Sequence, residues 1–116
     1  MTRIDHIGIA TKSIDSALPF WKALGFEASG GGIVEEQGVE VRYMQNMSDT
    51  RIELLEPTGS DTPVGRFIER RGEGIQQLAI SVPDIEETIE KLSKMGVIMI
   101  NSKPQIGHGG TRIAFV

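Results

Sequence analysis

Three polar residues in this chain have the side-chain chemistry to bind a divalent metal ion together. His6 lies in the segment IDHIGIA, Glu53 in the segment IELLEP and Gln77 in the segment GIQQLAI. An imidazole nitrogen, a carboxylate and an amide oxygen are donors that suit zinc, nickel, cobalt, manganese or magnesium. Such a set leaves coordination positions open for a substrate with two oxygens. Each residue taken alone also has an ordinary interpretation, as a structural histidine or a solvated polar side chain.

An internal repeat relates two of these residues. Residues 4–15 (IDHIGIATKSID) align with residues 75–86 (IQQLAISVPDIE) at a constant offset of 71. The offset pairs His6 with Gln77 and continues through apolar helical positions to Gly25 and Gly96. We therefore expect a strand, a loop, a helix and its terminal glycine to occur twice. The repeat favours one joint metal site over three unrelated side chains.

The expected secondary structure follows from apolar periodicity. Strands are predicted at 3–10, 39–45, 51–55, 97–100 and 111–116, and helices at 13–24, 61–71 and 84–95. Asp84 is a candidate N-cap with Glu87 as its capping-box partner, and Asp61 is a candidate cap of the middle helix. In the first helix, Ser16 as the cap would place Pro19 in the first turn, where its missing N–H costs nothing.

These elements predict an α+β fold in a single domain over residues 1–116. Module one covers about 3–57, a linker helix about 61–71 and module two about 75–116. Module one has the order β-α-β-β-β, whereas module two has β-α-β-β up to Val116. We expect its last strand to come from further chain or from a partner, because an unfinished sheet exposes an apolar edge.

Composition excludes several function classes. The 116 residues carry a net charge of −4, which argues against nonspecific nucleic-acid binding. The absence of cysteine excludes disulfides, thiolate zinc sites and a cysteine nucleophile. The apolar runs are too short for a membrane span, and the first residues lack an apolar signal core. The expected location is therefore the cytoplasm.

Other polar and glycine-rich segments have weaker functional interpretations. The run 30–32 (GGG) lacks the spacing and following helix of a phosphate-binding loop, so we interpret it as a flexible connector. His108 in IGHGG is interpreted as a mobile loop residue, with ligand contact as the alternative. The cluster of Arg66, Arg70 and Arg71 is interpreted as a solvated face, with an anion contact as the alternative.

Five strings that span nearly the whole chain match one family pattern. They are IDHIGIA (4–10), EEQGV (35–39), IELLEP (52–57), DTPVGRFIERRGEGI (61–75) and KPQIGHGGTRIAFV (103–116). The chain thereby resembles the vicinal oxygen chelate superfamily and, within it, the methylmalonyl-CoA epimerases. The resemblance implies paired βαβββ modules that form a curved mixed sheet around a cleft. It also implies His6 and Glu53 as metal ligands, with Gln77 at a third position where the family carries histidine.

The implied activity is metal-assisted proton transfer alpha to a thioester carbonyl through a stabilised enolate. One family base falls at Val41, and neighbouring Glu40 would face the opposite side of a strand. The other base and the fourth ligand fall after Val116, so no catalytic base is assigned. The alternatives are a glyoxalase-type lyase acting on a thiol–aldehyde adduct and a noncatalytic small-molecule-binding module. The expected partners are a small-molecule substrate, with acyl-CoA as the candidate, and a second copy in a homodimer, without nucleic acid or membrane.

Overall fold

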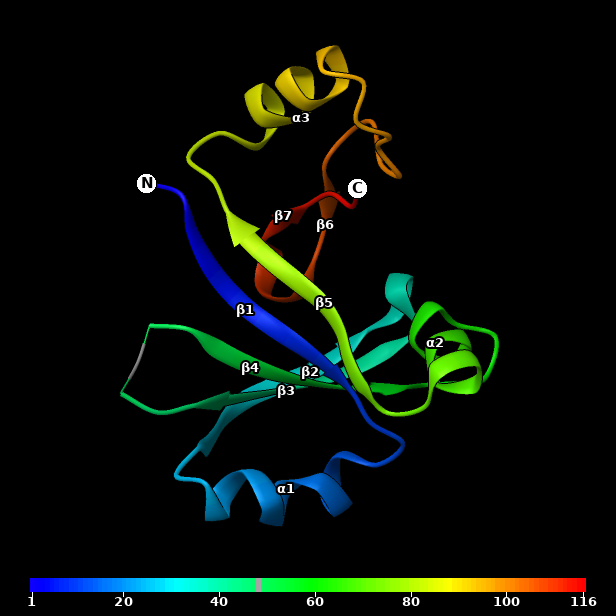
Figure 1. Ribbon diagram of the computed structural model, residues 1–116. Coiled ribbons are helices and arrows are strands. Elements are labelled where there is room, and N and C mark those ends of the chain that lie inside the picture. Colours follow the sequence, from blue (N-terminus) through cyan, green and yellow to red (C-terminus); the bar gives the residue numbers. More distant parts are fainter. Residues whose placement is uncertain (48) are drawn as a thin grey trace. The chain divides into compact units, whose positions relative to one another are not determined.

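The computed structural model describes residues 1–47 and 49–116, without the side chain of His108. Two compact units make up the chain, one of Ile4–Ile80 and one of Met1–Arg3 with Ser81–Val116. The helices are α1 (Ile14–Ala23), α2 (Pro63–Arg71) and α3 (Ile85–Lys94). The strands are β1 (Arg3–Ala10), β2 (Glu27–Val34), β3 (Val39–Gln45), β4 (Arg51–Pro57), β5 (Gly74–Ser81), β6 (Gln105–Ile106) and β7 (Arg112–Ile113) (Figure 1).

The larger sheet has the strand order β2-β3-β4-β1-β5. β1 and β4 run parallel, whereas β3 is antiparallel to both of its neighbours, β2 and β4. The sheet is therefore mixed, and with helices between its strands it confirms the predicted α+β class. β1 and β5, which begin the two copies of the sequence repeat, are adjacent in this order (Figure 1).

Each face of the sheet in the unit Ile4–Ile80 has its own apolar cluster. On one face, α1 packs against the strands through a cluster whose buried members are Ile14, Met44 and Leu54. On the other face, a second cluster is formed by buried residues of three strands and α2: Ala10, Val39, Val41, Leu55 and Val64. Because alternate residues of a strand share a face, the second cluster continues along β1 and β4 toward His6 and Glu53.

The helix predicted at 13–24 is confirmed, but Ser16 is not its cap. The helix begins at Ile14, with Ser13 as its N-cap, and Pro19 lies inside it. The Ser13 side chain accepts a hydrogen bond from the Ser16 N–H, and Glu56 Oε1 accepts one from the Ile14 N–H at 2.7 Å. These two acceptors satisfy the first turn, and packing on the sheet stabilises a helix that contains a proline.

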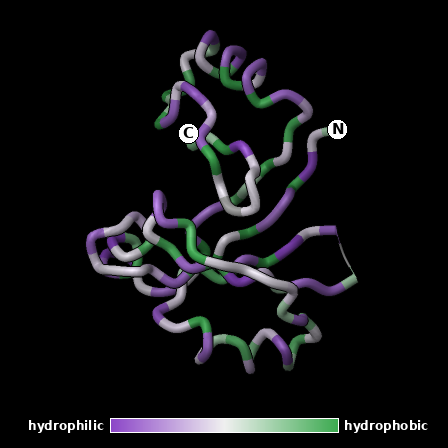
Figure 2. The backbone as a smooth tube through the Cα atoms, turned by 180° about the vertical axis from the view of Figure 1, so that it is seen from behind, coloured by the Kyte–Doolittle hydropathy of each residue, from purple (hydrophilic) through white to green (hydrophobic). Residues whose placement is uncertain are grey.

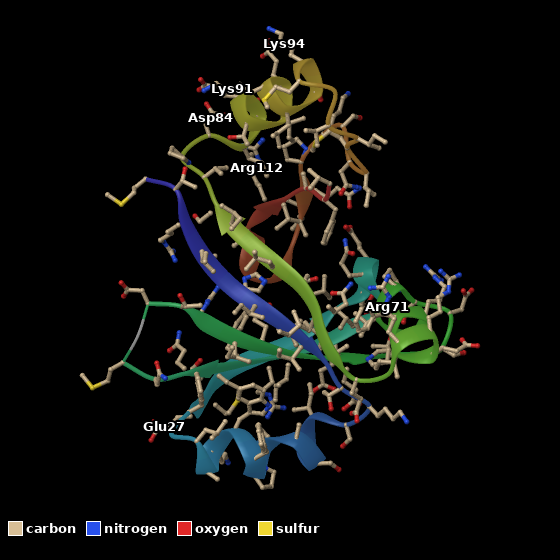
Figure 3. The ribbon with its side chains drawn as sticks, viewed as in Figure 1. Glu27, Arg71, Asp84, Lys91, Lys94 and Arg112 are labelled. Atoms are coloured by element: carbon tan, nitrogen blue, oxygen red, sulfur yellow. The ribbon has the colours of Figure 1, made fainter. Side chains whose placement is uncertain are left out.

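The cap of α2 also differs from the prediction. Thr62, rather than Asp61, is the N-cap, and its Oγ1 accepts from the Gly65 N–H at 3.0 Å. Pro63 then occupies the first helical position, where no N–H is needed. Asp61 instead pairs with Arg66 at 2.8 Å, and Arg66, Arg70 and Arg71 are exposed, as the solvated-face interpretation predicted. Figure 3 shows Arg71 at the end of α2.

The interpretation of residues 30–32 as a flexible connector is wrong. These glycines lie within β2 and pair with residues 41–43 of β3, after a register shift between Ala28 and Gly30. A Cβ atom on Gly31 would lie 2.0 Å from the Val41 carbonyl oxygen. Glycine is therefore required by the close approach of the two backbones beside the bulge, rather than by flexibility.

The unit of Met1–Arg3 with Ser81–Val116 contains α3 as predicted. The Asp84 side chain caps it by accepting from the Glu87 N–H at 3.0 Å. Lys91 pairs with Glu87 at 3.6 Å and Lys94 with Glu90 at 2.9 Å, which are the expected i,i+4 pairs. Figure 3 labels Asp84, Lys91 and Lys94 on α3.

The strands predicted for this unit are only partly correct. Residues 97–100 form no strand, although the Ile100 N–H donates to the Phe115 carbonyl at 2.8 Å. The strand predicted at 111–116 is present as the shorter β7, and it pairs with β6 from the expected loop. Between them the Gly107 N–H donates to the Thr111 carbonyl at 2.7 Å. A short turn brings β6 and β7 together, so their pairing closes a smaller loop than the predicted one.

The sequence repeat with its offset of 71 residues is reproduced in the hydrogen bonds at the ends of α1 and α3. The Phe26 N–H donates to the Trp21 carbonyl at 3.1 Å, and the Val97 N–H donates to the Leu92 carbonyl at 3.0 Å. Between these partners, Gly25 and Gly96 adopt φ values of 104° and 87°. Both helices therefore end in the same left-handed glycine motif, as the aligned glycines predicted.

The coloured backbone shows both hydrophilic and hydrophobic segments along α1 and α3 (Figure 2). Such a mixture is typical of helices that bury one face and expose the other. Among the described residues, no helix has both the length and the apolar character needed to cross a membrane.

Candidate metal centre

Three adjacent strands bring the predicted metal-binding residues to one face of the sheet. In the parallel register of β1 and β4, His6 lies opposite Arg51 and Gly8 lies opposite Glu53. His6 and Glu53 therefore share a face. Gln77 comes from β5, the other neighbour of β1. The position of the site thus depends on a strand order that places both copies of the repeat side by side.

The three side chains are in direct contact. His6 Nδ1 lies 3.1 Å from Glu53 Oε2, and His6 Nε2 lies 3.3 Å from Gln77 Nε2. The exposed fractions of the side chains are 15% for His6 and 9% for Glu53. The structure therefore brings together all the residues that the sequence nominated, in a position with limited access to water.

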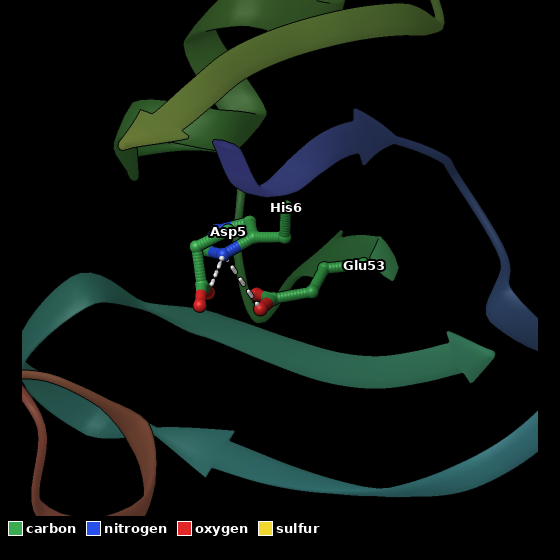
Figure 4. Close-up of side chains that lie close together, drawn as sticks. All are labelled: Asp5, His6 and Glu53. Carbon is green, nitrogen blue, oxygen red and sulfur yellow. Dashed lines mark hydrogen bonds and ion pairs between the residues drawn. The ribbon is translucent and has the colours of Figure 1, made fainter. Parts of the chain in front are cut away.

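Two further residues, Asp5 and Arg51, belong to this cluster and were missed from the sequence. Asp5 Oδ2 lies 2.9 Å from His6 Nδ1 and 2.9 Å from Arg51 Nη2. Figure 4 shows the imidazole between the carboxylates of Asp5 and Glu53. Consecutive strand residues normally point to opposite faces, which is why Asp5 was not expected beside His6. The sequence does indicate that Arg51 lies near the site, because it precedes Glu53 by two positions and so shares its face of the strand.

Gly8 makes room for the Gln77 side chain. A Cβ atom at position 8 would lie 2.5 Å from Gln77 Cγ and 2.9 Å from Leu55 Cδ1. These distances are shorter than ordinary van der Waals contact, so any larger residue would displace Gln77. The glycine between His6 and the core therefore lets an amide from β5 lie across β1.

The charges of the site are partly balanced by Arg51. Burial raises the pKa of Asp5, but hydrogen bonds from His6 and Arg51 outweigh it and lower the pKa below 3.8. Burial raises the pKa of Tyr43 above 10.0, the Glu53 carboxylate adds to this effect, and Arg51 opposes it. The Arg51 Cζ atom lies 4.8 Å from the Tyr43 ring centroid. At neutral pH, Asp5 is therefore ionised and Tyr43 is a neutral phenol.

The donor set fits a divalent metal ion. Asp5, His6 and Glu53 each offer a ligand atom, and these atoms lie within 4.8 Å of one another. The two contacts of His6 use different ring nitrogens, because Nδ1 lies 3.1 Å from Glu53 Oε2 and Nε2 lies 3.3 Å from Gln77 Nε2. One ion would meet only one of these nitrogens, and an ion at Nε2 would require the Glu53 carboxylate to turn toward it.

The neighbouring strand β3 presents no carboxylate on this face at position 41. Val41 is 4% exposed and packs in the cluster with Leu55 and Val64. The register of β3 with β4 is continuous from Val39 to Met44, so no bulge turns Glu40 toward the site. Glu40 instead pairs with Arg42 at 3.6 Å on the opposite face. The expectation that Glu40 cannot replace a base at Val41 is therefore met.

The prediction for the His108 side chain lies outside the described residues.

Comparison with protein-family models identifies the superfamily to which the chain belongs. Residues 5–115 match the model of the Glyoxalase/Bleomycin resistance protein/Dioxygenase superfamily. The chain belongs to this superfamily. Its relatives include an uncharacterized protein of Bacillus subtilis, YqjC, at 38% identity over 100% of this chain and 83% of the relative. Human mitochondrial methylmalonyl-CoA epimerase is 29% identical over 98% of this chain, which spans 65% of the human protein.

Solved structures of the superfamily match the same fold. A hypothetical protein of Bacillus halodurans C-125 has a TM-score of 0.93 at 40% identity, over 97% of this chain and 82% of its own. Streptomyces coelicolor methylmalonyl-CoA epimerase in complex with 2-nitronate-propionyl-CoA has a TM-score of 0.91 at 35% identity, over 98% and 83%. The recognised superfamily and its epimerase branch are thus confirmed as the relatives of this chain.

Proposed function

We propose that this chain catalyses metal-assisted proton transfer alpha to the thioester carbonyl of an acyl-CoA, as methylmalonyl-CoA epimerases do. The observation that carries the proposal is the meeting of His6, Glu53 and Gln77 on one face of the sheet. Support comes from a methylmalonyl-CoA epimerase bound to methylmalonyl-CoA, which is 35% identical to this chain with a TM-score of 0.90. Similar folds host different reactions, so the side chains of the site carry the argument.

In this proposal His6, Glu53 and Gln77 hold the divalent metal ion. When bound, the ion supplies Lewis-acid stabilisation of the charge that develops on the substrate oxygens as the α-proton leaves. Arg51, 3.7 Å from Glu53 Oε2 and 2.9 Å from Asp5 Oδ2, offsets the negative charge of the two carboxylates. Limited exposure of His6 and Glu53 excludes competing water and strengthens their electrostatic interactions.

The proton-transferring base in this proposal does not come from β3. Val41 carries no acid–base group, and Glu40 lies on the opposite face. Tyr43 lies opposite Glu53, but its raised pKa keeps it a neutral phenol, which is a poor base. A base has to come within hydrogen-bond reach, about 3 Å, of the α-proton or act through a water molecule. We therefore propose that the base is supplied from outside β3, and that the reaction depends first on the polarising site around His6.

Deuterium exchange tests the reaction directly. The protein is incubated with methylmalonyl-CoA in heavy water with Ni²⁺ or Co²⁺, and incorporation at the α-carbon is followed by NMR. We expect exchange that requires both metal and His6. Exchange no faster than with the His6→Ala variant would contradict the proposal. Turnover of a hemithioacetal without this exchange would instead support a lyase, and ligand stabilisation without metal would support a binding module.

Metal binding is tested separately by stoichiometry. Equilibrium dialysis against Ni²⁺ or Co²⁺ is expected to give one ion per chain in the unmodified protein. The His6→Ala and Glu53→Ala variants are each expected to lose that ion, because each removes a donor from the same cluster. Equal binding by the unmodified protein and His6→Ala would reject the metal centre.

We also propose that two copies of the chain associate as a homodimer. β5 is the last strand in the order of the larger sheet, and it carries Ile75, Leu78 and Ile80 with exposed fractions of 67%, 59% and 47%. A terminal strand with exposed apolar side chains favours pairing with another chain. Light scattering is expected to give the mass of a dimer, and a monomer at high protein concentration would contradict it.

A further inference from the structure

We propose that Asp5 is a positioning residue that holds the proton of His6 on Nδ1 and so leaves Nε2 as the metal-binding atom. This inference rests on the proposed function for the metal itself. The role assigned to Asp5 is one of orientation, through the imidazole, rather than direct contact with the substrate. Metal-binding histidines are commonly oriented in this way by a carboxylate on the other ring nitrogen.

The contacts of Nδ1 place a proton on that nitrogen. Asp5 Oδ2 lies 2.9 Å from Nδ1 and Glu53 Oε2 lies 3.1 Å from it. Both oxygens belong to carboxylates, which accept hydrogen bonds when ionised. An imidazole nitrogen that faces two carboxylate acceptors carries a hydrogen, whether the ring is neutral or charged.

The contact of Nε2 fits the same tautomer. With the hydrogen on Nδ1, His6 Nε2 presents its lone pair toward β5, where Gln77 Nε2 lies 3.3 Å away and can donate to it. Rotation of the Gln77 amide would direct its oxygen to the same place. A metal ion there would meet the imidazole lone pair and the amide oxygen together.

Arg51 makes Asp5 a fixed acceptor. Arg51 Nη2 donates to Asp5 Oδ2 at 2.9 Å, the same oxygen that faces His6. The guanidinium is held in turn by stacking over the Tyr43 ring, 4.8 Å from its centroid. The Glu53 carboxylate is both an acceptor beside His6 Nδ1 and a proposed metal ligand. Once Glu53 turns to the metal, Asp5 is the acceptor that remains at Nδ1.

A tautomer measurement on the metal-free protein tests this proposal. Long-range ¹H–¹⁵N NMR is recorded over a series of alkaline pH values, in the range where the ¹⁵N shifts of the ring no longer change with pH. Resonances of His6 are assigned with His6→Ala, because the chain has a second histidine, His108. The Glu53→Ala variant is expected to keep the Nδ1–H form, and the Asp5→Ala/Glu53→Ala variant is expected to shift toward Nε2–H. The same tautomer in both variants would overturn the proposal.

Metal affinity provides the second measurement, which does not depend on the folding of the double variant. Asp5→Asn is expected to weaken Ni²⁺ binding about 10-fold to 100-fold, the usual effect of losing such a partner. The control is Asp61→Asn, which removes an exposed carboxylate paired with Arg66 at 2.8 Å and is expected to leave the affinity unchanged. Equal loss in both variants, or no loss in Asp5→Asn, would overturn the role of Asp5. Because the tautomer is read without substrate or metal, failure of α-proton exchange would leave that result standing.

Discussion

Gly8 lies directly beneath the side chain of Gln77, so that the amide crosses β1 where any other residue would carry a Cβ atom. The Cβ position is 2.5 Å from Gln77 Cγ, and the backbone of Gly8 pairs with that of Glu53 on β4. The glycine at position 8 therefore leaves the room that Gln77, from the second copy of the repeat, needs to reach His6 of the first copy.

Gly8→Ala is expected to displace Gln77 and weaken both the fold and the metal site. Overpacking of this kind usually destabilises by about 1–3 kcal/mol. Urea unfolding measures the loss of stability, and titration with Ni²⁺ measures the loss of affinity. The control is Gly59→Ala, because a Cβ atom at Gly59 meets nothing within 4 Å. Equal effects of the two substitutions would show that the contact with Gln77 is unimportant.

Gln77→His is expected to strengthen metal binding. An imidazole is a stronger donor than an amide oxygen for nickel, cobalt or zinc, and position 77 already faces His6 Nε2 at 3.3 Å. Calorimetric titration with Ni²⁺ is expected to give an affinity at least about tenfold higher, which corresponds to about 1.4 kcal/mol. As a control, Gln76→His alters the preceding residue of β5, whose side chain points to the opposite face. Equal affinity of Gln77→His and the unmodified protein would place Gln77 outside the metal site.

The titration of Tyr43 reports the charge of the site. Burial and the Glu53 carboxylate raise the pKa of Tyr43, and Arg51 lowers it. Glu53→Gln is therefore expected to lower this pKa, and Arg51→Gln to raise it further. Phenolate absorbance measures it without ambiguity, because the chain contains one tyrosine. Glu40→Gln, on the opposite face of β3, is the matched control. Shifts in the same direction for Glu53→Gln and Arg51→Gln would contradict this electrostatic arrangement.

Glu73 is expected to make folding stability depend on pH in the acid range. Its Oε2 accepts from the Lys12 N–H at 2.7 Å and from Thr11 Oγ1 at 3.0 Å, and these bonds lower the pKa of Glu73 below 4.5. The stabilisation is present above the unfolded pKa, near 4.5, and is lost as pH falls through the lower folded pKa. Urea unfolding between neutral and acid pH is expected to show a shallower dependence for Glu73→Gln. Glu69→Gln, which removes an exposed carboxylate of α2, is the comparison, and an identical profile for the two variants would count against Glu73.

Local patterns in the sequence predicted the elements whose signals lie within one helix or strand. The Asp84 cap, the glycine ends at Gly25 and Gly96 and the alternation of β1 depend on residues a few positions apart, so the sequence contains all of their determinants. The repeat added one longer relation, His6 with Gln77, because a duplicated unit repeats its geometry along with its pattern. The α+β class follows from these signals, and they also nominate His6, Glu53 and Gln77 as candidate metal ligands.

Contacts between residues distant in the chain decided the features that local sequence patterns did not predict. α1 begins at Ile14 because Glu56, 42 residues away, accepts the N–H of its first residue. Residues 30–32 form a strand because they pair with β3, and Gly31 has no side chain to prevent the close approach of that strand. The Asp5 carboxylate lies beside His6 because Arg51, 46 residues from Asp5, donates a hydrogen bond to it there. Such contacts join residues distant in the chain through the strand register, so no local pattern encodes them. The sequence by itself thus determined which residues could bind a metal, and the packing of β1 between β4 and β5 determined how they meet.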